Sequence, residues 1–149
     1  MKILTYVSLV LLMLSACAEG NNHNVEDPKE HAEKFFELYK DQDPQTALDY
    51  IYSDELITVG DQLQENIGQM KNQLGGLEER MGPYKSHDLI ESRELGSKLK
   101  AYSYLAHYRD QPLHIIFVFH KPADNWRVLY FNYSDNVEGR LIEKLQNLE

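Results

Sequence analysis

Two histidines in the C-terminal half of the chain are spaced so that they could share a metal ion. If Asp110-Gln111 is a two-residue turn between antiparallel strands, His107 lies directly opposite His114 on one face of the sheet. Imidazole nitrogens are common zinc ligands, but a zinc site needs at least three protein ligands. His120 is about 20 Å along the same strand from His114, at ~3.3 Å per residue, which is too far. We therefore predict no metal site.

Tyrosine is unusually frequent, with ten residues in the chain, and several tyrosines alternate along one predicted strand. A tyrosine gives a pocket an apolar body with a polar tip, which suits a small amphipathic or aromatic ligand. The candidate pocket consists of four aromatic residues and one carboxylate: Tyr102, Tyr104, Phe117, Tyr130 and Asp88. The alternative is that these aromatic residues are strand formers packed beneath helices, which is their more common role.

Short catalytic motifs are absent from the sequence. It has no Gly-rich phosphate loop, no Gly-x-Ser-x-Gly elbow, no His-Glu-x-x-His pair and no paired-cysteine metal motif. We predict no catalytic residue and no cofactor, and therefore a non-enzymatic binding or interaction domain. Two alternatives stay open. One is a small cofactor-free enzyme of the hydrolyase or isomerase type, which uses the tyrosine pocket with Asp88 or a histidine. The other is a structural or assembly protein.

The N-terminus has the parts of a bacterial signal peptide, which we assign to residues 1–16. Met1-Lys2 is a short basic start, and Ile3 to Leu14 form an apolar core shorter than the ~20 residues that span a bilayer. The tract Leu14-Ser15-Ala16-Cys17 resembles the lipobox, in which small residues precede the lipidated cysteine and a branched apolar residue stands three positions upstream. The alternative is an ordinary secretory signal followed by a chance cysteine.

The lipobox resemblance implies a membrane anchor at Cys17, the only cysteine of the chain. In such lipoproteins the cysteine carries a diacylglyceryl thioether and an N-acyl chain such as palmitate, which together are sufficient for stable anchoring. The protein is then expected in the bacterial cell envelope, attached to a membrane without crossing it. Ala18 stands where an Asp would favour the inner membrane, so in a Gram-negative host we expect the outer membrane, facing the periplasm.

The formal net charge is −9 at pH 7. An acidic surface repels nucleic acid and opposes broad adhesion to anionic lipid. We therefore predict no nucleic-acid partner, and we expect attachment to depend on the acyl chains.

Residues 17–26 are small, amide-rich and charged, which predicts a flexible tether before a single domain at 27–149. Asp27-Pro28 and Asp43-Pro44 each place an N-cap before a proline at the first helical position. An apolar stripe at helical spacing continues to Met81, although Gly75-Gly76 weakens its middle. The expected helices cover residues 28–41, 44–53 and 63–81.

After Gly82-Pro83 the apolar period changes from helical to alternating, which predicts an antiparallel sheet with short connections. The expected strands cover residues 84–94, 98–109, 113–121 and 126–134. If residues 122–125 form a loop, Phe117 faces Tyr130. Both sheet faces are then largely apolar, so each must be covered. One face meets the helices. The other meets the C-terminal segment Val137 to Leu148, a second copy of the chain or an envelope protein partner.

This element order resembles the nuclear transport factor 2-like, or cystatin-like, superfamily, and more narrowly the small bacterial lipoproteins of that fold. The resemblance covers about residues 27–134. It rests on three N-terminal helices, a long antiparallel sheet and the late tract Asn125-Trp126-Arg127-Val128-Leu129-Tyr130. It implies an α+β fold in which helices pack on a curved sheet of about four strands, shaped as a cone that can hold a ligand or an active site. We expect a short C-terminal helix in addition. The superfamily hosts isomerases, dehydratases, binding proteins and inert scaffolds, so it assigns no activity to any residue.

Overall fold

The computed structural model describes residues 27–53 and 61–146, which form helices followed by a sheet and a last helix. The helices are α1 (Pro28–Asp41), α2 (Pro44–Ile51), α3 (Asp61–Gly75), α4 (Leu77–Met81) and α5 (Val137–Gln146). The strands are β1 (Tyr84–Leu95), β2 (Leu99–Tyr108), β3 (Pro112–His120) and β4 (Arg127–Ser134).

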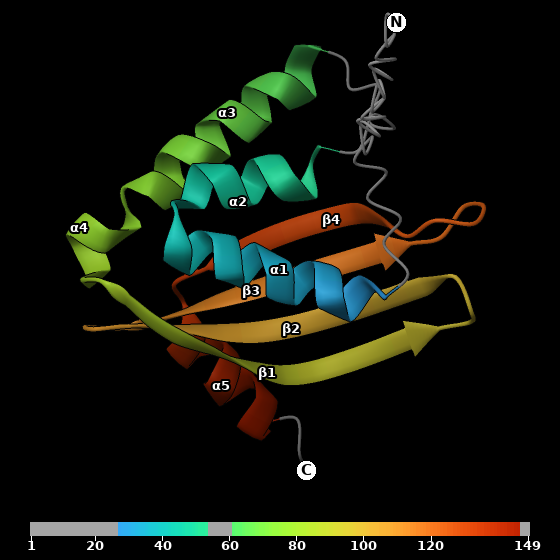
Figure 1. Cartoon of the computed structure of the whole chain (residues 1–149). Coiled ribbons are helices and arrows are strands. Elements are labelled where there is room, and N and C mark those ends of the chain that lie inside the picture. Colours follow the sequence, from blue (N-terminus) through green and yellow to red (C-terminus); the bar gives the residue numbers. More distant parts are fainter. Residues whose placement is uncertain (1–26, 54–60, 147–149) are drawn as a thin grey trace, which may run out of the picture.

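The four strands pair in chain order as an antiparallel meander. The helices α1 to α4 lie on one face of this sheet, called the inner face here, and α5 lies on the other, the outer face (Figure 1). This is the predicted α+β architecture, including its short C-terminal helix. Within the described residues, no helix has the length and apolar character needed to cross a membrane.

Both N-terminal helices begin as the Asp-Pro pairs predict. The Asp27 carboxylate accepts a hydrogen bond from the backbone N–H of Lys29 at 2.8 Å, and the Asp43 carboxylate accepts one from Thr46 at 2.7 Å. Proline fits the next position because an N–H there has no partner within the helix. The first helix covers its predicted residues 28–41, whereas the second ends at Ile51, slightly before its predicted end.

The third helical stretch is divided at Gly75-Gly76, where the sequence weakens it. Leu77 and Met81 of α4 remain buried, so the apolar stripe continues across the break. Gly82 then has a φ of +76°, and a Cβ there would lie 2.8 Å from the Cβ of Arg109. The chain therefore leaves the helical layer through a position that favours glycine.

The register of β2 and β3 is shifted by two residues from the predicted one. His107 lies opposite Pro112, and His114 lies opposite Leu105. Side chains alternate with a period of two, so this shift keeps every residue of both strands on its predicted face. The predicted pairing of His107 with His114 is therefore wrong, although both histidines lie on the outer face.

The cause of this shift is the segment that precedes β1. The backbone N–H of Arg109 donates to the carbonyl of Pro83 at 3.1 Å, and the N–H of Asp110 donates to the carbonyl of Met81 at 3.0 Å. These two N–H groups are thus engaged outside the β2–β3 hairpin and do not serve a tight turn. Pairing of the two strands begins only at Pro112.

A β-bulge in β4 exchanges the faces of its two central aromatic residues. The register between β3 and β4 shifts by one residue between Val118 and Phe119, and a one-residue shift moves the following side chains to the opposite face. Tyr130 points to the outer face and is 49% exposed, whereas Phe131 points inward and is 5% exposed. The predicted pair of Phe117 with Tyr130 is therefore wrong, because Phe117 lies opposite Phe131.

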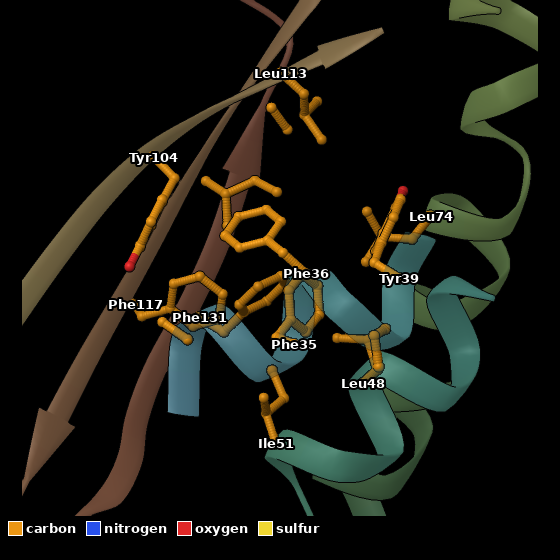
Figure 2. Packing of buried hydrophobic residues seen from close by; sticks show 14 of the residues in the cluster. Phe35, Phe36, Tyr39, Leu48, Ile51, Leu74, Tyr104, Leu113, Phe117 and Phe131 are labelled. Atoms are coloured by element: carbon orange, nitrogen blue, oxygen red, sulfur yellow. The ribbon is translucent and has the colours of Figure 1, made fainter. Parts of the chain in front are cut away.

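The centre of the inner face packs against the aromatic side of α1. Phe35 and Phe36 point towards Phe117 and Phe131 of the sheet (Figure 2). The ring centroid of Phe35 lies 5.3 Å from that of Phe117 and 5.5 Å from that of Phe131. These are tilted and edge contacts, the arrangements that aromatic pairs prefer. Tyr104 joins the same cluster and is fully buried.

The outer face is partly covered by α5. The side-chain oxygen of Asn136 accepts a hydrogen bond from the backbone N–H of Gly139 at 3.1 Å, close to the start of this helix. The helix contacts β3, while Leu141, Ile142 and Leu145 stay largely exposed. It thus forms one wall of a hollow over the sheet and leaves part of the apolar outer face open.

Candidate functional site

The structure separates the five residues of the candidate tyrosine pocket. Tyr102, Tyr104 and Phe117 lie together on the inner face, where all three are buried. Tyr130 and Asp88 lie on the outer face. The bulge in β4 explains the position of Tyr130. A catalytic set of tyrosines with Asp88 on the inner face is therefore not assembled, because its carboxylate is on the other side of the sheet.

A hydrogen-bonded network on the inner side joins α1 to the edge strand β1. The Nε2 of His87 lies 2.7 Å from a carboxylate oxygen of Glu33, and the Tyr84 hydroxyl lies 2.8 Å from Nδ1 of the same ring. The Tyr104 hydroxyl donates to Glu33 at 3.0 Å. Burial, and then the charge of Glu33, raise the pKa of Tyr104, so this hydroxyl stays a proton donor. Both ring nitrogens of His87 are thus paired, and the network joins α1 to the sheet.

A pocket of about 740 Å³ opens on the outer face, between the first three strands and α5. We call it the outer-face pocket. Its volume falls within the range of about 300 to 1,000 Å³ typical of small-molecule sites. Its apolar wall is formed by Ile90, Ala101, Leu105, Ile116, Val137 and Leu141. Tyr102, one of the predicted pocket residues, also contributes to its lining.

The polar centre of this pocket is the pair of Ser103 and His114. The Ser103 hydroxyl oxygen lies 2.5 Å from Nε2 of His114. Ser103 lies opposite Ile116, so His114 is its diagonal neighbour on the same face of the sheet. His114 is 7% exposed, and its Nδ1 is buried without a hydrogen-bond partner among the described residues. An unpaired buried polar atom costs stability, so a ligand that satisfies it would gain affinity.

Burial lowers the pKa of His114, and the positive charge of Arg140 lowers it further. The imidazole is therefore neutral near pH 7, with one ring nitrogen as a donor and the other as an acceptor. One nitrogen is occupied by Ser103. The other, Nδ1, is buried without a partner among the described residues, in a side chain that lines the pocket.

Four charged side chains surround this centre. Glu91 and Arg93 come from β1, and Arg140 and Glu143 come from α5. The guanidinium of Arg93 donates to Glu91 at 2.5 Å. The two basic and two acidic groups balance each other, so the pocket suits a neutral or zwitterionic head group better than a multiply charged one.

Metal binding has little support in the geometry. Across residues 27–53 and 61–146, no group of three or more His, Cys, Asp or Glu residues is placed to hold a metal ion. Asp88 and His107 do meet on the outer face, with the carboxylate 2.8 Å from Nε2. Two ligands on an exposed sheet face fall short of the three that a zinc site requires.

Ser103 and Arg140 were not among the site residues predicted from the sequence. Ser103 and His114 meet only in the observed register. The predicted two-residue turn gave a register that differs by two residues and keeps them apart. Arg140 arrives from a helix after the sheet, and no spacing in the sequence links it to either strand. One feature of the sequence could have indicated this pair: Ser103 and His114 stand among apolar residues on one predicted face of the sheet.

Comparison with known proteins supports the fold and assigns no function. No family model matches the sequence, and no curated protein matches it. A solved structure that does match is a Campylobacter jejuni protein described as an NTF2-like transpeptidase. The match has a TM-score of 0.54 and 19% identity, and it covers 70% of this chain and 98% of that one. The chain thus has an NTF2-like fold, as the resemblance implied.

Proposed function

We propose that this protein is a lipid-anchored cell-envelope protein whose NTF2-like domain binds a small amphipathic molecule in the outer-face pocket. The observation that carries the proposal is His114, which is 7% exposed, with Nδ1 buried and unpaired among the described residues that line an apolar hollow. Binding sites typically combine apolar walls with a few placed polar groups. A ligand with an apolar body and one neutral or zwitterionic head fits this combination.

The anchor is the part of the proposal that the sequence supports. Cys17 follows a signal-like apolar core and completes a lipobox, and it lies outside the described residues. The domain itself has no spanning helix among those residues, so a lipid on Cys17 would supply the attachment to the membrane. An outer-membrane position facing the periplasm follows from Ala18 in a Gram-negative host.

The test compares two substitutions of the full chain, purified from membranes of its own host. Ile116→Trp fills the pocket, whereas Val118→Trp introduces the same side chain on the same face of β3 outside the pocket lining. Native mass spectrometry should find a small molecule at fixed stoichiometry in the wild type and in Val118→Trp, and lose it in Ile116→Trp. Equal retention in both variants would show that the ligand binds elsewhere.

A second candidate function is acyl transfer, favoured by the 2.5 Å contact between the Ser103 hydroxyl and Nε2 of His114. In that reaction the Ser103 oxygen attacks an acyl carbonyl, and His114 accepts the hydroxyl proton and later gives it to the leaving group. The neutral state of His114 suits a base. However, its Nδ1 lacks the orienting partner that such pairs usually have. At 19% identity, the likeness to the protein described as a transpeptidase transfers no activity.

A fluorophosphonate probe separates the two functions, because it labels an activated serine covalently. Under the binding proposal, wild type and Ser103→Ala remain equally unlabelled. Labelling of the wild type that disappears in both Ser103→Ala and His114→Gln would replace the binding proposal with acyl transfer.

A further inference from the structure

One end of the domain is formed by two hairpin tips that lie side by side. We call residues 93–100 and 120–127 together the hairpin end. The first range joins β1 to β2, and the second joins β3 to β4. Leu99 lies opposite His120, and the backbone N–H of Lys121 donates to the carbonyl of Lys98 at 2.9 Å. Both tips extend on the same side of the molecule in Figure 1.

The hairpin end is basic although the chain is acidic. It contains two acidic residues, Glu94 and Asp124, and five basic ones: Arg93, Lys98, Lys100, Lys121 and Arg127. Arg93 is paired with Glu91 and Lys100 with Glu94, so Lys98 and Lys121 are the cations on which a contact with anionic lipid depends. The whole chain has a formal charge of −9, so the rest of the molecule is strongly negative. At the tip of the first hairpin, Leu95 is 75% exposed. An exposed leucine among cations is a pattern suited to a surface of anionic lipid.

Packing of the second tip orients two of these cations. The Nζ of Lys100 lies 5.5 Å from the ring centroid of Trp126, and the Nζ of Lys121 lies 6.0 Å from it. Trp126 itself is 6% exposed, so packing holds its ring in place. Cation–π attraction therefore holds both ammonium groups beside one rigid ring.

The chain enters the domain at this same end. Asp27, the N-cap of α1, is near enough to Lys100 to contribute to raising its pKa, after the larger effect of the Glu94 hydrogen bond. The ring of His31, one turn further on, lies 5.6 Å from that of Phe119, which pairs with Lys100. A lipid on Cys17 would be separated from Asp27 by a tether that reaches at most ~35 Å, at about 3.5 Å per residue. Such an anchor would hold the end of the domain at which Asp27 lies within that distance of the membrane.

We propose that the hairpin end is the membrane-facing surface of this protein. Leu95 enters the interface of an anionic phospholipid leaflet, and the lysines around it contact lipid phosphates. This proposal rests on the lipid anchor of the proposed function, and it refines the expectation that an acidic chain avoids anionic lipid. The overall repulsion acts on the remaining surface, so the domain is oriented with its one basic end towards the bilayer.

The experiment uses the full lipidated chain reconstituted into vesicles, after mass spectrometry has shown the lipid on Cys17. A fluorophore is attached to Leu95→Cys at the hairpin end, or to Gln111→Cys in the exposed loop between β2 and β3 at the other end. Brominated phosphatidylglycerol quenches a fluorophore that touches the membrane. We expect quenching at position 95 and none at position 111, and weaker quenching at 95 in brominated phosphatidylcholine or at high salt.

Charge reversal tests the role of the lysines. Lys98→Glu with Lys121→Glu should reduce the ratio of contacting to free domain by at least about 25-fold, since each lysine near an anionic surface contributes about fivefold. The matched control is Lys40→Glu with Lys85→Glu, which changes the net charge equally at exposed sites away from the hairpin end. It should leave quenching at position 95 nearly unchanged. Circular dichroism checks that each variant is folded.

Three results would overturn the proposal. If Cys17 carries no lipid, the proposed anchor is refuted, and the proposed membrane-facing surface is refuted as well. If Cys17 is lipidated but positions 95 and 111 are quenched equally, the domain has no preferred end. If both charge reversals act alike, net charge and not the hairpin end controls the contact.

Discussion

The bulge in β4 determines which of two adjacent aromatic residues supports the core, and paired alanine substitutions test it. Phe131 is 5% exposed, and its ring lies 5.1 Å from Phe117 and 5.5 Å from Phe35. Truncation of a buried phenylalanine costs about 3 to 5 kcal/mol, because apolar burial is lost and a cavity remains. Tyr130 is 49% exposed and faces away from the helices. Its truncation should therefore cost below about 1 kcal/mol.

The assay is urea unfolding of each variant, followed by circular dichroism and by the fluorescence of Trp126, the only tryptophan of the chain. We expect Phe131→Ala to lower the unfolding midpoint strongly and Tyr130→Ala to lower it little, with similar slopes. A loss of about 4 kcal/mol is a large part of the 5 to 15 kcal/mol typical of a domain. Phe131→Leu, expected to cost below about 1.5 kcal/mol, keeps the comparison measurable if Phe131→Ala does not fold. An equal or larger loss in Tyr130→Ala would refute the bulge and restore the unbulged register.

Three further predictions concern hydrogen-bonded and titratable side chains of the domain. Glu33→Gln should lower the free energy of unfolding by about 1 to 3 kcal/mol, because His87 loses a carboxylate acceptor. Urea titration checks this. An unchanged midpoint would contradict the view that Glu33 and His87 hold α1 on the sheet. His114 has a lowered pKa in the folded state, so the unfolded state binds its proton first. Stability should then fall as the pH drops below about 6.5, and His114→Gln should remove that component in thermal melts at several pH values. The hydroxyls of Tyr39 and Tyr108 are hydrogen-bonded to each other in the core, so Tyr39→Phe should cost about 1 to 3 kcal/mol. The double Tyr-to-Phe variant should cost less than the sum of the single ones, and strict additivity would mean that the two hydroxyls do not interact.

Local signals in the sequence were sufficient for the helices. Each Asp-Pro pair combines a side-chain cap with a residue whose φ is already helical, and both act within four residues of chain. Gly75-Gly76 likewise marked the position where the third helical stretch divides. These features depend on short-range geometry, so no knowledge of the tertiary fold was needed to predict them.

Strand register depended on contacts that the sequence does not contain. The β2–β3 pairing is fixed by hydrogen bonds from Arg109 and Asp110 to the segment before β1, a contact between distant parts of the chain. The bulge in β4 adds one residue to one strand, and alternating apolar residues on both faces give no sign of it. The predicted site was affected more than the predicted fold, because a site depends on individual side chains and a fold depends on patterns.

The location of the candidate site follows from what fills the inner face. In a cone-shaped fold the inner face is the expected place for a ligand, but here Phe35 and Phe36 of α1 pack directly on Phe117, and all three are essentially unexposed. Polar groups on that side, such as Glu33 and His87, are paired with each other. The outer face has the opposite properties: a hollow walled by α5, apolar side chains and a buried histidine nitrogen without a partner in the described chain. Core stability and the proposed ligand binding thus depend on opposite faces of one sheet. Substitutions in the outer-face pocket should therefore change binding at little cost to folding, whereas substitutions beneath α1 should do the reverse.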